Sequence, residues 1–264
     1  MNDHRRTDDA IPARDRVRLD VTDRVARITL DAPEQHNALG AEDVHAFRSH
    51  LDHLEEDGSA RVLVVSGTGP DTFCAGASLP ELASGQMTGE LFETLTDRLA
   101  AVRLPTICAL NGSAYGGGAE LALCCDFRIG VTGSRLRVPA ARLGVCYPVG
   151  GLERYVRRLG LSVAKRILVA GDELDATEML RVGFLTRLVE PSELGGVTDA
   201  LADRLAGQAP LAVRAMKRIL DAVEAGSLDA AEARALVEAC EASDDRREGL
   251  EAQRQGREPV FRGR

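Results

Sequence analysis

Twice in this sequence a short, wholly apolar run is followed by a glycine-rich loop and then by apolar residues at helical spacing. The first run is 62–65, followed by the loop 66–78, and the second is 107–110, followed by the loop 111–118. A run that is apolar throughout is typical of a strand buried on both faces, as in parallel sheets covered by helices. The repeated order of strand, loop and helix therefore predicts an α/β fold.

The remaining patterns predict a core followed by a helical tail. We predict a disordered leader at 1–16, an α/β core at 17–195 and a C-terminal helical region at 196–264 that serves in assembly. Ser78 and Glu81 have the spacing of a capping box at the start of a helix. Further strands are expected at 17–21, 25–30, 126–131 and 184–189. Helices are expected at 38–56, 78–103, 151–170, 175–182, 191–206, 210–225, 228–242 and 244–254, with Gly85 and Gly89 interrupting the helical segment at 78–103.

Composition narrows the range of possible partners. The 264 residues carry a net charge of -8, which argues against general binding to nucleic acid or to an anionic membrane surface. No stretch of about 18 apolar residues is present, so we expect no transmembrane helix. The six cysteines form no C-x-x-C motif, and we expect buried free thiols in a reducing compartment, the cytoplasm, with no bound metal.

Glu120 follows the second glycine-rich loop and stands one turn on from Gly117. Two backbone N–H groups from neighbouring loops can converge on one carbonyl oxygen, and one such donor can stabilise an oxyanion by about 3 kcal/mol. The helix dipole is expected to favour the ionised form of Glu120, which suits a general base. The alternative is a tight turn followed by an exposed glutamate.

Six segments carry a resemblance to a known superfamily over nearly the whole chain. In order and spacing they resemble the crotonase superfamily, which contains the enoyl-CoA hydratases and isomerases. The resemblance implies a crotonase-type spiral of ββα units with a C-terminal helical subdomain, assembled as a homotrimer or a dimer of trimers. It also implies an acyl-CoA substrate, with no cofactor besides the coenzyme A of that substrate. The segments are VARITLDAPEQHNALG (25–40), FCAGASLPEL (73–82), NGSAYGGGAELALCCDFRI (111–129), PAARLGVCYPVGG (139–151), DATEMLRVGFLTRLV (175–189) and PVFRGR (259–264).

The same resemblance implies roles for particular residues. The N–H groups of Ala77 and Gly117 would form the oxyanion hole, and Glu120 would correspond to the hydratase glutamate that activates water. For His36 a solvated position is the alternative to contact with the nucleotide. The residues expected to bind coenzyme A are Gln35, His36, Ala38, Ala75, Gly76, Ala77, Gly117, Arg257 and Phe261.

Departures from the family pattern leave the reaction open. The second hydratase glutamate falls at Ala140, which has no carboxyl group, so ordinary hydration is in question. Tyr147 resembles a tyrosine of the methylmalonyl-CoA decarboxylase branch that orients the substrate carboxylate, although that branch has histidine at the position of Ala77. Packing or a trimer contact is the alternative role for Tyr147. Arg142 could meet an acidic acyl group, or it could lie in solvent or at a subunit interface.

Three functional hypotheses remain from the sequence. The first is a lyase that hydrates or dehydrates the α and β carbons of an acyl-CoA, with Glu120 as acid and base. The second is decarboxylation of a malonyl-type thioester, which the tyrosine motivates. The third is a protein that binds acyl-CoA without turning it over, which the missing glutamate motivates.

Overall fold

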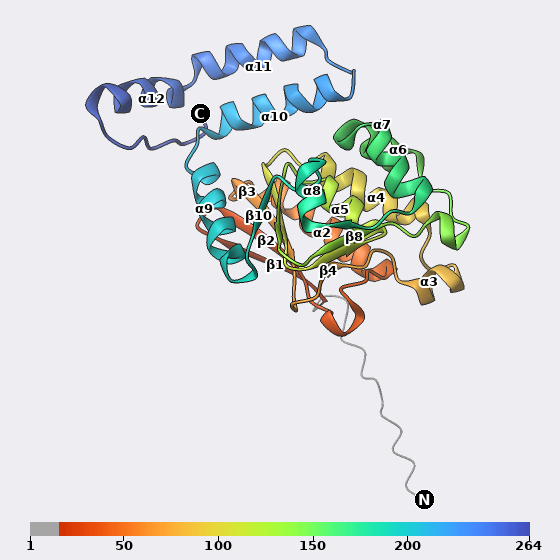
Figure 1. Cartoon of the computed structure of the whole chain (residues 1–264). Coiled ribbons are helices and arrows are strands. Elements are labelled where there is room, and N and C mark those ends of the chain that lie inside the picture. Colours follow the sequence, from red (N-terminus) through yellow and green to blue (C-terminus); the bar gives the residue numbers. More distant parts are fainter. Residues whose placement is uncertain (1–15) are drawn as a thin grey trace, which may run out of the picture.

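The computed structural model describes residues 16–264 and contains two sheets (Figure 1). The larger has six strands in the order β1 (Val17–Thr22), β2 (Val25–Leu30), β3 (Val62–Gly67), β5 (Thr106–Leu110), β7 (Phe127–Val131) and β10 (Arg187–Val189). The first two strands form an antiparallel hairpin, and each later neighbour pairs in parallel. The predicted strands are confirmed, although β10 begins three residues after the expected start at 184.

The second sheet lies outside the strands that the sequence pattern predicts, and two of its strands lie within the glycine-rich loops. Its four strands are β4 (Thr72–Cys74), β6 (Ser113–Tyr115), β8 (Arg135–Arg137) and β9 (Leu174–Asp175), in that order. β4 and β6 pair in parallel, which joins the two glycine-rich loops directly. Strands of two or three residues are too short to show an alternating pattern, so sequence periodicity cannot detect them.

Glycines divide two of the predicted helical segments: the break at Gly85 confirms the expected interruption of 78–103, whereas 151–170 was predicted as continuous and is divided at Gly160. Gly85 and Gly160 both have positive φ, a conformation that favours glycine and ends a helix. No helix within residues 16–264 is both long and apolar enough to cross a membrane. The helices of the core are α2 (Ala41–Asp57), α3 (Leu79–Ser84), α4 (Gly89–Ala100), α5 (Gly117–Leu123), α6 (Val149–Leu159), α7 (Leu161–Lys165) and α8 (Ala176–Arg181), with a π-helical turn at Arg166–Ala170 and 3-10 turns at Pro33–Gln35, Ala141–Leu143 and Pro191–Glu193.

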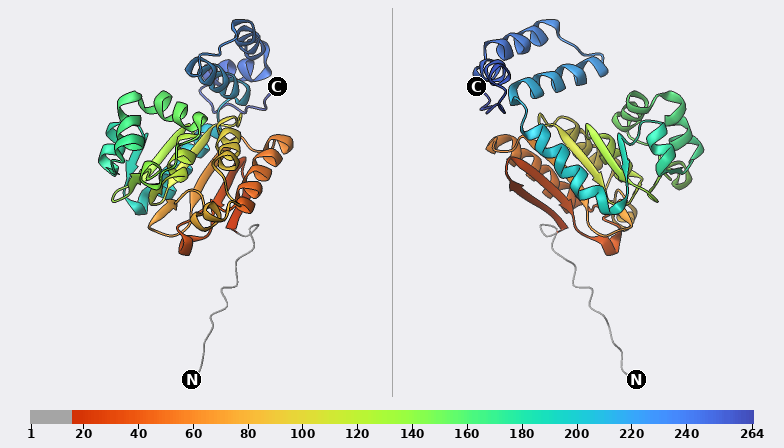
Figure 2. Two further views of the ribbon diagram at one scale, coloured as in Figure 1. Left: turned by 90° about the vertical axis from the view of Figure 1, so that its right-hand side faces the viewer. Right: turned by 60° about the vertical axis from the view of Figure 1, so that its left-hand side comes forward.

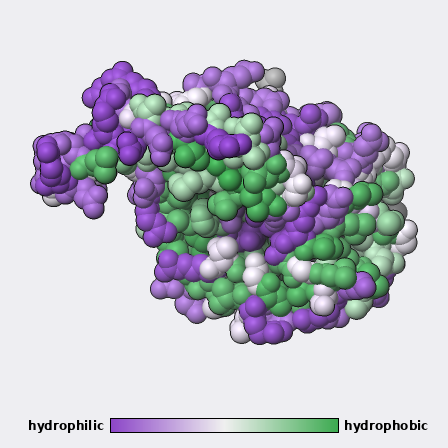
Figure 3. Space-filling model, turned by 90° about the horizontal axis from the view of Figure 1, so that it is seen from above, coloured by the Kyte–Doolittle hydropathy of each residue, from purple (hydrophilic) through white to green (hydrophobic). Residues whose placement is uncertain are grey.

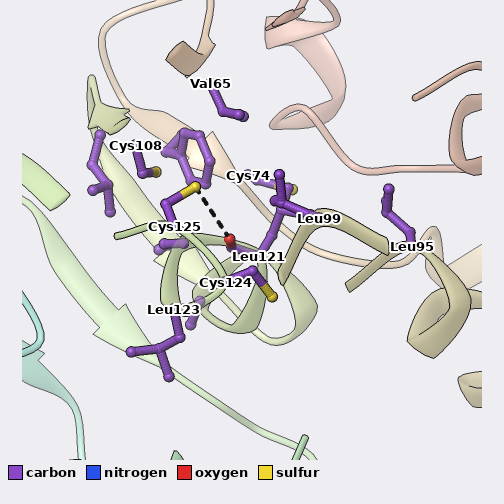
Figure 4. Packing of buried hydrophobic residues seen from close by; sticks show 14 of the residues in the cluster. Val65, Cys74, Leu95, Leu99, Cys108, Leu121, Leu123, Cys124 and Cys125 are labelled. Carbon is purple, nitrogen blue, oxygen red and sulfur yellow. Dashed lines mark hydrogen bonds between the residues drawn. The ribbon is translucent and has the colours of Figure 1, made fainter. Parts of the chain in front are cut away.

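The main core surrounds α5 (Figure 4). From Gly118 to Leu123 every residue of this helix is buried. The thiol of Cys125 donates to the backbone oxygen of Leu121 at 3.9 Å, and leucines of α4 pack nearby. Cys74, Cys108, Cys124 and Cys125 are buried free thiols as predicted, whereas Cys146 is exposed and Cys240 is partly exposed. The core therefore holds α5, and with it Glu120, in a fixed position.

The helical tail begins later than the predicted boundary at residue 196. α9 (Leu194–Ala206) lies across the outer face of the larger sheet, where Ala202 and Ala206 pack with Val62 and Ile107 (Figure 2). The core therefore extends through α9. Beyond it, α10 (Pro210–Glu224), α11 (Ala230–Ala242) and α12 (Asp244–Gln255) form an arm that projects from the body (Figure 1).

The predicted leader at 1–16 lies outside the described residues except for Arg16. This arginine belongs to the folded core, because Nη2 donates to the backbone oxygen of Ala38 at 2.9 Å and lies 3.4 Å from Oδ2 of Asp43.

Candidate active site

A cavity of about 1350 Å³ opens beside the first turn of α5. It is bounded by the loops that carry β4 and β6, the first turn of α4, and the segment from 131 to 148. Of the residues predicted to form the site, those that line this cavity are Gln35, His36, Ala38, Ala75, Ala77, Gly117, Glu120 and Tyr147. Gly76, Arg257 and Phe261 do not line it.

Gly76 lies beneath the cavity, where the two glycine-rich loops touch. Its φ is +85°, and a Cβ atom at this position would lie 2.5 Å from the backbone nitrogen of Gly117. A Cβ atom on Gly117 would lie 2.5 Å from the ring of Phe92, and one on Gly118 would overlap the backbone oxygen of Cys74. Gly76 and Gly118 are required because the two backbones approach more closely there than any side chain permits, and Gly117 leaves room for the ring of Phe92.

The local geometry leaves the N–H groups of Ala77 and Gly117 without hydrogen-bond acceptors among residues 16–264. Leu39 pairs with this loop as a parallel bridge: its N–H donates to Gly76 O at 2.8 Å, and its oxygen accepts from Ser78 N at 2.8 Å. The N–H of Ala77 therefore points to the opposite side, toward the cavity that this residue lines. Gly117 is the first residue of α5, so its N–H has no acceptor inside the helix.

Glu120 is buried, with 2% of its surface exposed, and it still contributes to the cavity wall. The alternative of an exposed glutamate is therefore wrong. Nη1 of Arg154 donates to its Oε1, and Nη2 of the same guanidinium lies 2.8 Å from Oδ1 of Asp97. Burial raises the pKa of Glu120, and the opposing effects of Arg154, Thr96 and Tyr147 offset only part of the rise. The sequence analysis expects the helix dipole to favour the ionised form of Glu120, and burial acts in the opposite direction by raising the pKa.

Arg154 has no counterpart in the sequence analysis. It belongs to α6, whose sequence also carries two other arginines, and no local pattern separates it from them. A usable signal is the glycine pair in the first turn of this helix. A Cβ atom on Gly151 would lie 3.0 Å from Oε1 of Glu120, so glycine is needed there for the carboxylate to approach α6. Two glycines weaken a helix, and their presence in its first turn indicates a close approach.

Tyr147 stands at the start of the same helix and packs edge-on against Tyr155, with ring centroids 6.0 Å apart and an interplanar angle of 89°. Its hydroxyl is buried and has no hydrogen-bond partner among residues 16–264. It faces the Glu120 carboxyl closely enough to affect the pKa of that group, although it does not form a hydrogen bond of normal geometry. Burial raises the pKa of Tyr147, so the phenol is neutral.

The segment 134–150 supplies much of the wall opposite the glycine-rich loops. Ala140 lines the cavity and is half-buried. Arg142 is exposed and does not line the cavity, so the structure places it in solvent. Leu143 and Val145 also line the cavity and are 56% and 51% exposed, which gives it an apolar rim.

His36 and Gln35 lie at the exposed edge of the cavity. Nδ1 of His36 is 3.2 Å from the hydroxyl of Thr72. The next residue, Asn37, is buried and ties the loops together: Oδ1 accepts from Ala32 N at 2.9 Å, and Nδ2 donates to Thr72 O at 2.8 Å. Asn37 therefore fixes the edge on which His36 stands. No sequence signal points to this structural role of Asn37.

Arg257 and Phe261 lie on the arm. Arg257 forms an ion pair with Glu248 at 2.6 Å. The backbone oxygen of Phe261 accepts from Nη2 of Arg61 at 2.6 Å, and its ring lines a separate, apolar groove of about 410 Å³. Within one chain these two residues do not close over the cavity, because the arm projects from the body.

The predicted capping box at Ser78 does not form. The Ser78 side chain makes no capping hydrogen bond to α3. Glu81 instead accepts from Ala41 N through Oε2 at 2.8 Å, so it caps α2, a helix far away in the sequence. Spacing alone cannot show that a tertiary donor competes for the same carboxylate.

Charged groups line the cavity unevenly. Arg135 is paired with Glu173, and Arg137 is half-buried. Glu93 lines the cavity close to Glu120 and receives a hydrogen bond from Gly150 N at 2.9 Å.

In the part of the chain that the structure describes, no group of three or more histidine, cysteine or acidic side chains is placed to hold a metal ion.

Comparisons with known proteins agree over most of the chain. A family model described as enoyl-CoA hydratase/isomerase matches residues 20–264. The chain is 30% identical over 242 residues to a short-chain-enoyl-CoA hydratase of Clostridium acetobutylicum, which covers 89% of this chain and 92% of that protein. It is 34% identical over 247 residues to the 2,3-dehydroadipyl-CoA hydratase of Escherichia coli, with 91% and 96% covered. A crystal structure of an enoyl-CoA hydratase from Bacillus anthracis matches with a TM-score of 0.87 at 28% identity, covering 94% of this chain and 100% of that one.

Proposed function

The chain belongs to the enoyl-CoA hydratase/isomerase family, and from this premise we propose that it hydrates or dehydrates the α and β carbons of an acyl-CoA thioester. The same membership confirms the predicted crotonase-type α/β fold with its helical C-terminal region. Two relatives that carry the name hydratase are 30% and 34% identical to this chain, and their names support the class of reaction. The acyl group is a separate question that their names do not answer.

One observation carries this proposal. In the part of the chain that the structure describes, the N–H groups of Ala77 and Gly117 have no acceptor, and both residues line a cavity whose wall also includes Glu120. A thioester oxygen bound by both donors would gain negative charge as an enolate forms, and fixed donors stabilise that charge without reorganisation. Glu120, ionised, would take a proton from water as the water oxygen bonds to the β carbon.

The proposed coenzyme A site lies at the edge of the cavity beside the first loop. Gln35, His36 and Ala38 stand at that edge, and Ala75 precedes the donor at Ala77. Gly76 would contribute by allowing the two loops to meet rather than by touching the ligand. We propose no further cofactor, because the thioester itself provides the acidity at the α carbon that the reaction uses.

The charge of the cavity favours hydration over decarboxylation. A malonyl-type thioester would bring its own carboxylate into the region of the ionised Glu120, where like charges repel. Tyr147 could orient such a group, yet its hydroxyl faces Glu120. Loss of CO2 from methylmalonyl-CoA by the purified protein would revive the decarboxylase hypothesis, and binding without turnover would support the third.

We also propose assembly into a homotrimer or a dimer of trimers through the arm. Met216, Leu220 and Val223 share one face of α10 and are 56%, 66% and 55% exposed. Figure 3 shows large hydrophobic areas on the body next to the more hydrophilic arm. Apolar surface of this extent is usually covered in an oligomer. A cytoplasmic location stays a prediction.

The direct experiment is hydration of crotonyl-CoA, followed by the loss of absorbance of the conjugated enoyl thioester. Wild-type protein should turn over this substrate, and Glu120→Gln should not. Turnover that is unchanged in Glu120→Gln would remove the proposed role of this residue.

A further inference from the structure

Glu93 is a second carboxylate in the wall of the cavity that holds Glu120. It is half-buried on α4, one residue after Phe92, whose ring lies against Gly117. The family resemblance places the second hydratase glutamate at Ala140, which has no carboxyl group and lines the same cavity. A catalytic role for Glu93 would rest on the proposed function and extend it to a second residue.

Glu93 and Glu120 approach consecutive residues in the first turn of α6. Oε1 of Glu93 accepts from the N–H of Gly150 at 2.9 Å. Oε1 of Glu120 would lie 3.0 Å from a Cβ atom on Gly151. The two carboxylates therefore reach the same helix end from two different helices, and the glycine pair provides the space for both.

α4 continues along the site beyond Glu93. Thr96 stands three residues later, on the same side of the helix, and its hydroxyl favours the ionised form of Glu120. Asp97 then binds the guanidinium of Arg154, which holds Glu120. Because Phe92 touches Gly117 and Thr96 affects Glu120, Glu93 lies on the stretch of α4 between the proposed oxyanion donor and the proposed base.

The hydrogen bond to Gly150 occupies only one oxygen of Glu93. Oε2 has no hydrogen-bond partner and no ion-pair partner among residues 16–264. This differs from Glu120, whose carboxylate is fixed by Arg154, and from Glu173, which is paired with Arg135. A cavity-lining carboxylate with one oxygen anchored and the other unpaired can exchange a proton with a bound molecule.

We propose that Glu93 is the second catalytic carboxylate of this enzyme and moves the proton at the α carbon of the acyl-CoA. In hydration, Glu120 takes a proton from water while the water oxygen bonds to the β carbon, and the double-bond electrons pass into the thioester enolate. The carboxyl group of Glu93 then gives its proton to the α carbon, which restores the thioester. The proton on Glu120 returns to Glu93 through solvent, so one water is added and both groups are reset.

The test separates α-proton transfer from hydration. Butyryl-CoA has no double bond, so exchange of its α hydrogen for deuterium in D2O reports only the removal and return of that proton. The full-length protein is compared as wild type, Glu93→Gln and Glu81→Gln, with mass spectrometry for exchange and crotonyl-CoA for hydration. Glutamine at 93 keeps an oxygen to accept from Gly150 N, so the fold should be retained. Glu81 is a matched control, because it also caps a helix through a tertiary contact and does not line the cavity.

We expect Glu93→Gln to slow both exchange and hydration by about 100-fold or more, with an unchanged melting temperature, and Glu81→Gln to stay within about threefold of wild type. Exchange by the wild type that is lost in Glu93→Gln supports the assignment even if crotonyl-CoA is not hydrated. Hydration and exchange that both survive in Glu93→Gln overturn the role of Glu93 and leave the proposed function standing. A wild type that performs neither reaction overturns both.

Discussion

Arg154 binds Glu120 from α6 without itself lining the cavity. The side chains are 12% and 3% exposed, so this ion pair lies almost entirely within the protein. The Arg154 guanidinium also pairs with Asp97, so two carboxylates neutralise its charge. Glu120 has no other cationic partner among residues 16–264. The pair therefore fixes the orientation of the proposed base and opposes the rise in its pKa that burial causes.

Replacing Arg154 with methionine should shift the acid limb of the pH–rate profile to higher pH. Arg154 lowers the pKa of Glu120 against the effect of burial, so its removal allows the pKa to rise further and less base is present at a given pH. We expect kcat/KM near neutral pH to fall about tenfold, and the free energy of unfolding to fall by up to about 3 kcal/mol. The measurement is the pH dependence of kcat/KM with crotonyl-CoA.

Arg157→Met is the matched control on the same helix. Its ion pair with Glu153 is exposed, at 39% and 54%, and exposed pairs contribute about 0.5 kcal/mol or less. An acid limb that moves equally in both variants, or in neither, would show that Arg154 does not set the charge of Glu120.

Gly76→Ala should damage catalysis by separating the two loops. The new Cβ atom would lie 2.5 Å from Gly117 N, so the backbone that presents the donors must move. Loss of one well-placed donor lowers kcat by about 10² to 10³. Gly58→Ala is the control, because Gly58 also has a positive φ but has no atom within 4 Å of a Cβ position. If both variants lose activity equally, backbone strain rather than the position of the donors explains the effect.

The sequence predicts the site residues whose positions follow from the local order of strand, loop and helix. Glu120, Gly117 and Ala77 stand in segments where strand, loop and helix follow one another, so their mutual approach can be predicted from a repeated pattern. Arg154 and Glu93 could not be located in this way. Their contacts join α4, α5 and α6, and a helix sequence shows which face is apolar but not which polar side chain meets a distant partner.

Glu81 shows the opposite error. Its spacing from Ser78 fits a local cap, but the carboxylate binds the backbone N–H of Ala41. The start of α2 lies against this loop because Leu39 bridges to Ala77, which brings a competing donor within reach. The tertiary contact with Ala41 therefore replaces the local cap that the spacing predicts.

The free energy of unfolding of Glu120→Gln, compared with that of the wild type, should be more favourable at neutral pH than at acid pH. The pKa of Glu120 is raised above its ordinary value of 4.5 in the folded state, so this group loses its proton at a lower pH in the unfolded state than in the folded state. The stability linked to this group is present below that ordinary value and is lost as pH rises through the folded pKa. Urea unfolding at about pH 4 and about pH 7.5 should show the difference between variant and wild type growing in favour of the variant. A difference that shrinks with rising pH would mean that the folded pKa is lowered.

Leu220→Asp should prevent assembly. Leu220 is 66% exposed on the apolar face of α10, and a buried unpaired carboxylate at an interface is costly. Light scattering should give the mass of a trimer or hexamer for the wild type and that of a 28.3 kDa monomer for the variant. Val21→Asp, on β1 rather than the arm, should leave the mass unchanged. A wild-type monomer would contradict the proposed role of the arm.

The central claim is that Glu120 acts as the base in a cavity whose N–H donors bind a thioester. The most direct measurement is the turnover of crotonyl-CoA by Glu120→Gln, together with the affinity of both proteins for butyryl-CoA. We predict that kcat falls by about 10² to 10⁴ while the affinity stays within about threefold. An undiminished kcat, or a loss of rate that follows entirely from lost binding, would contradict the account.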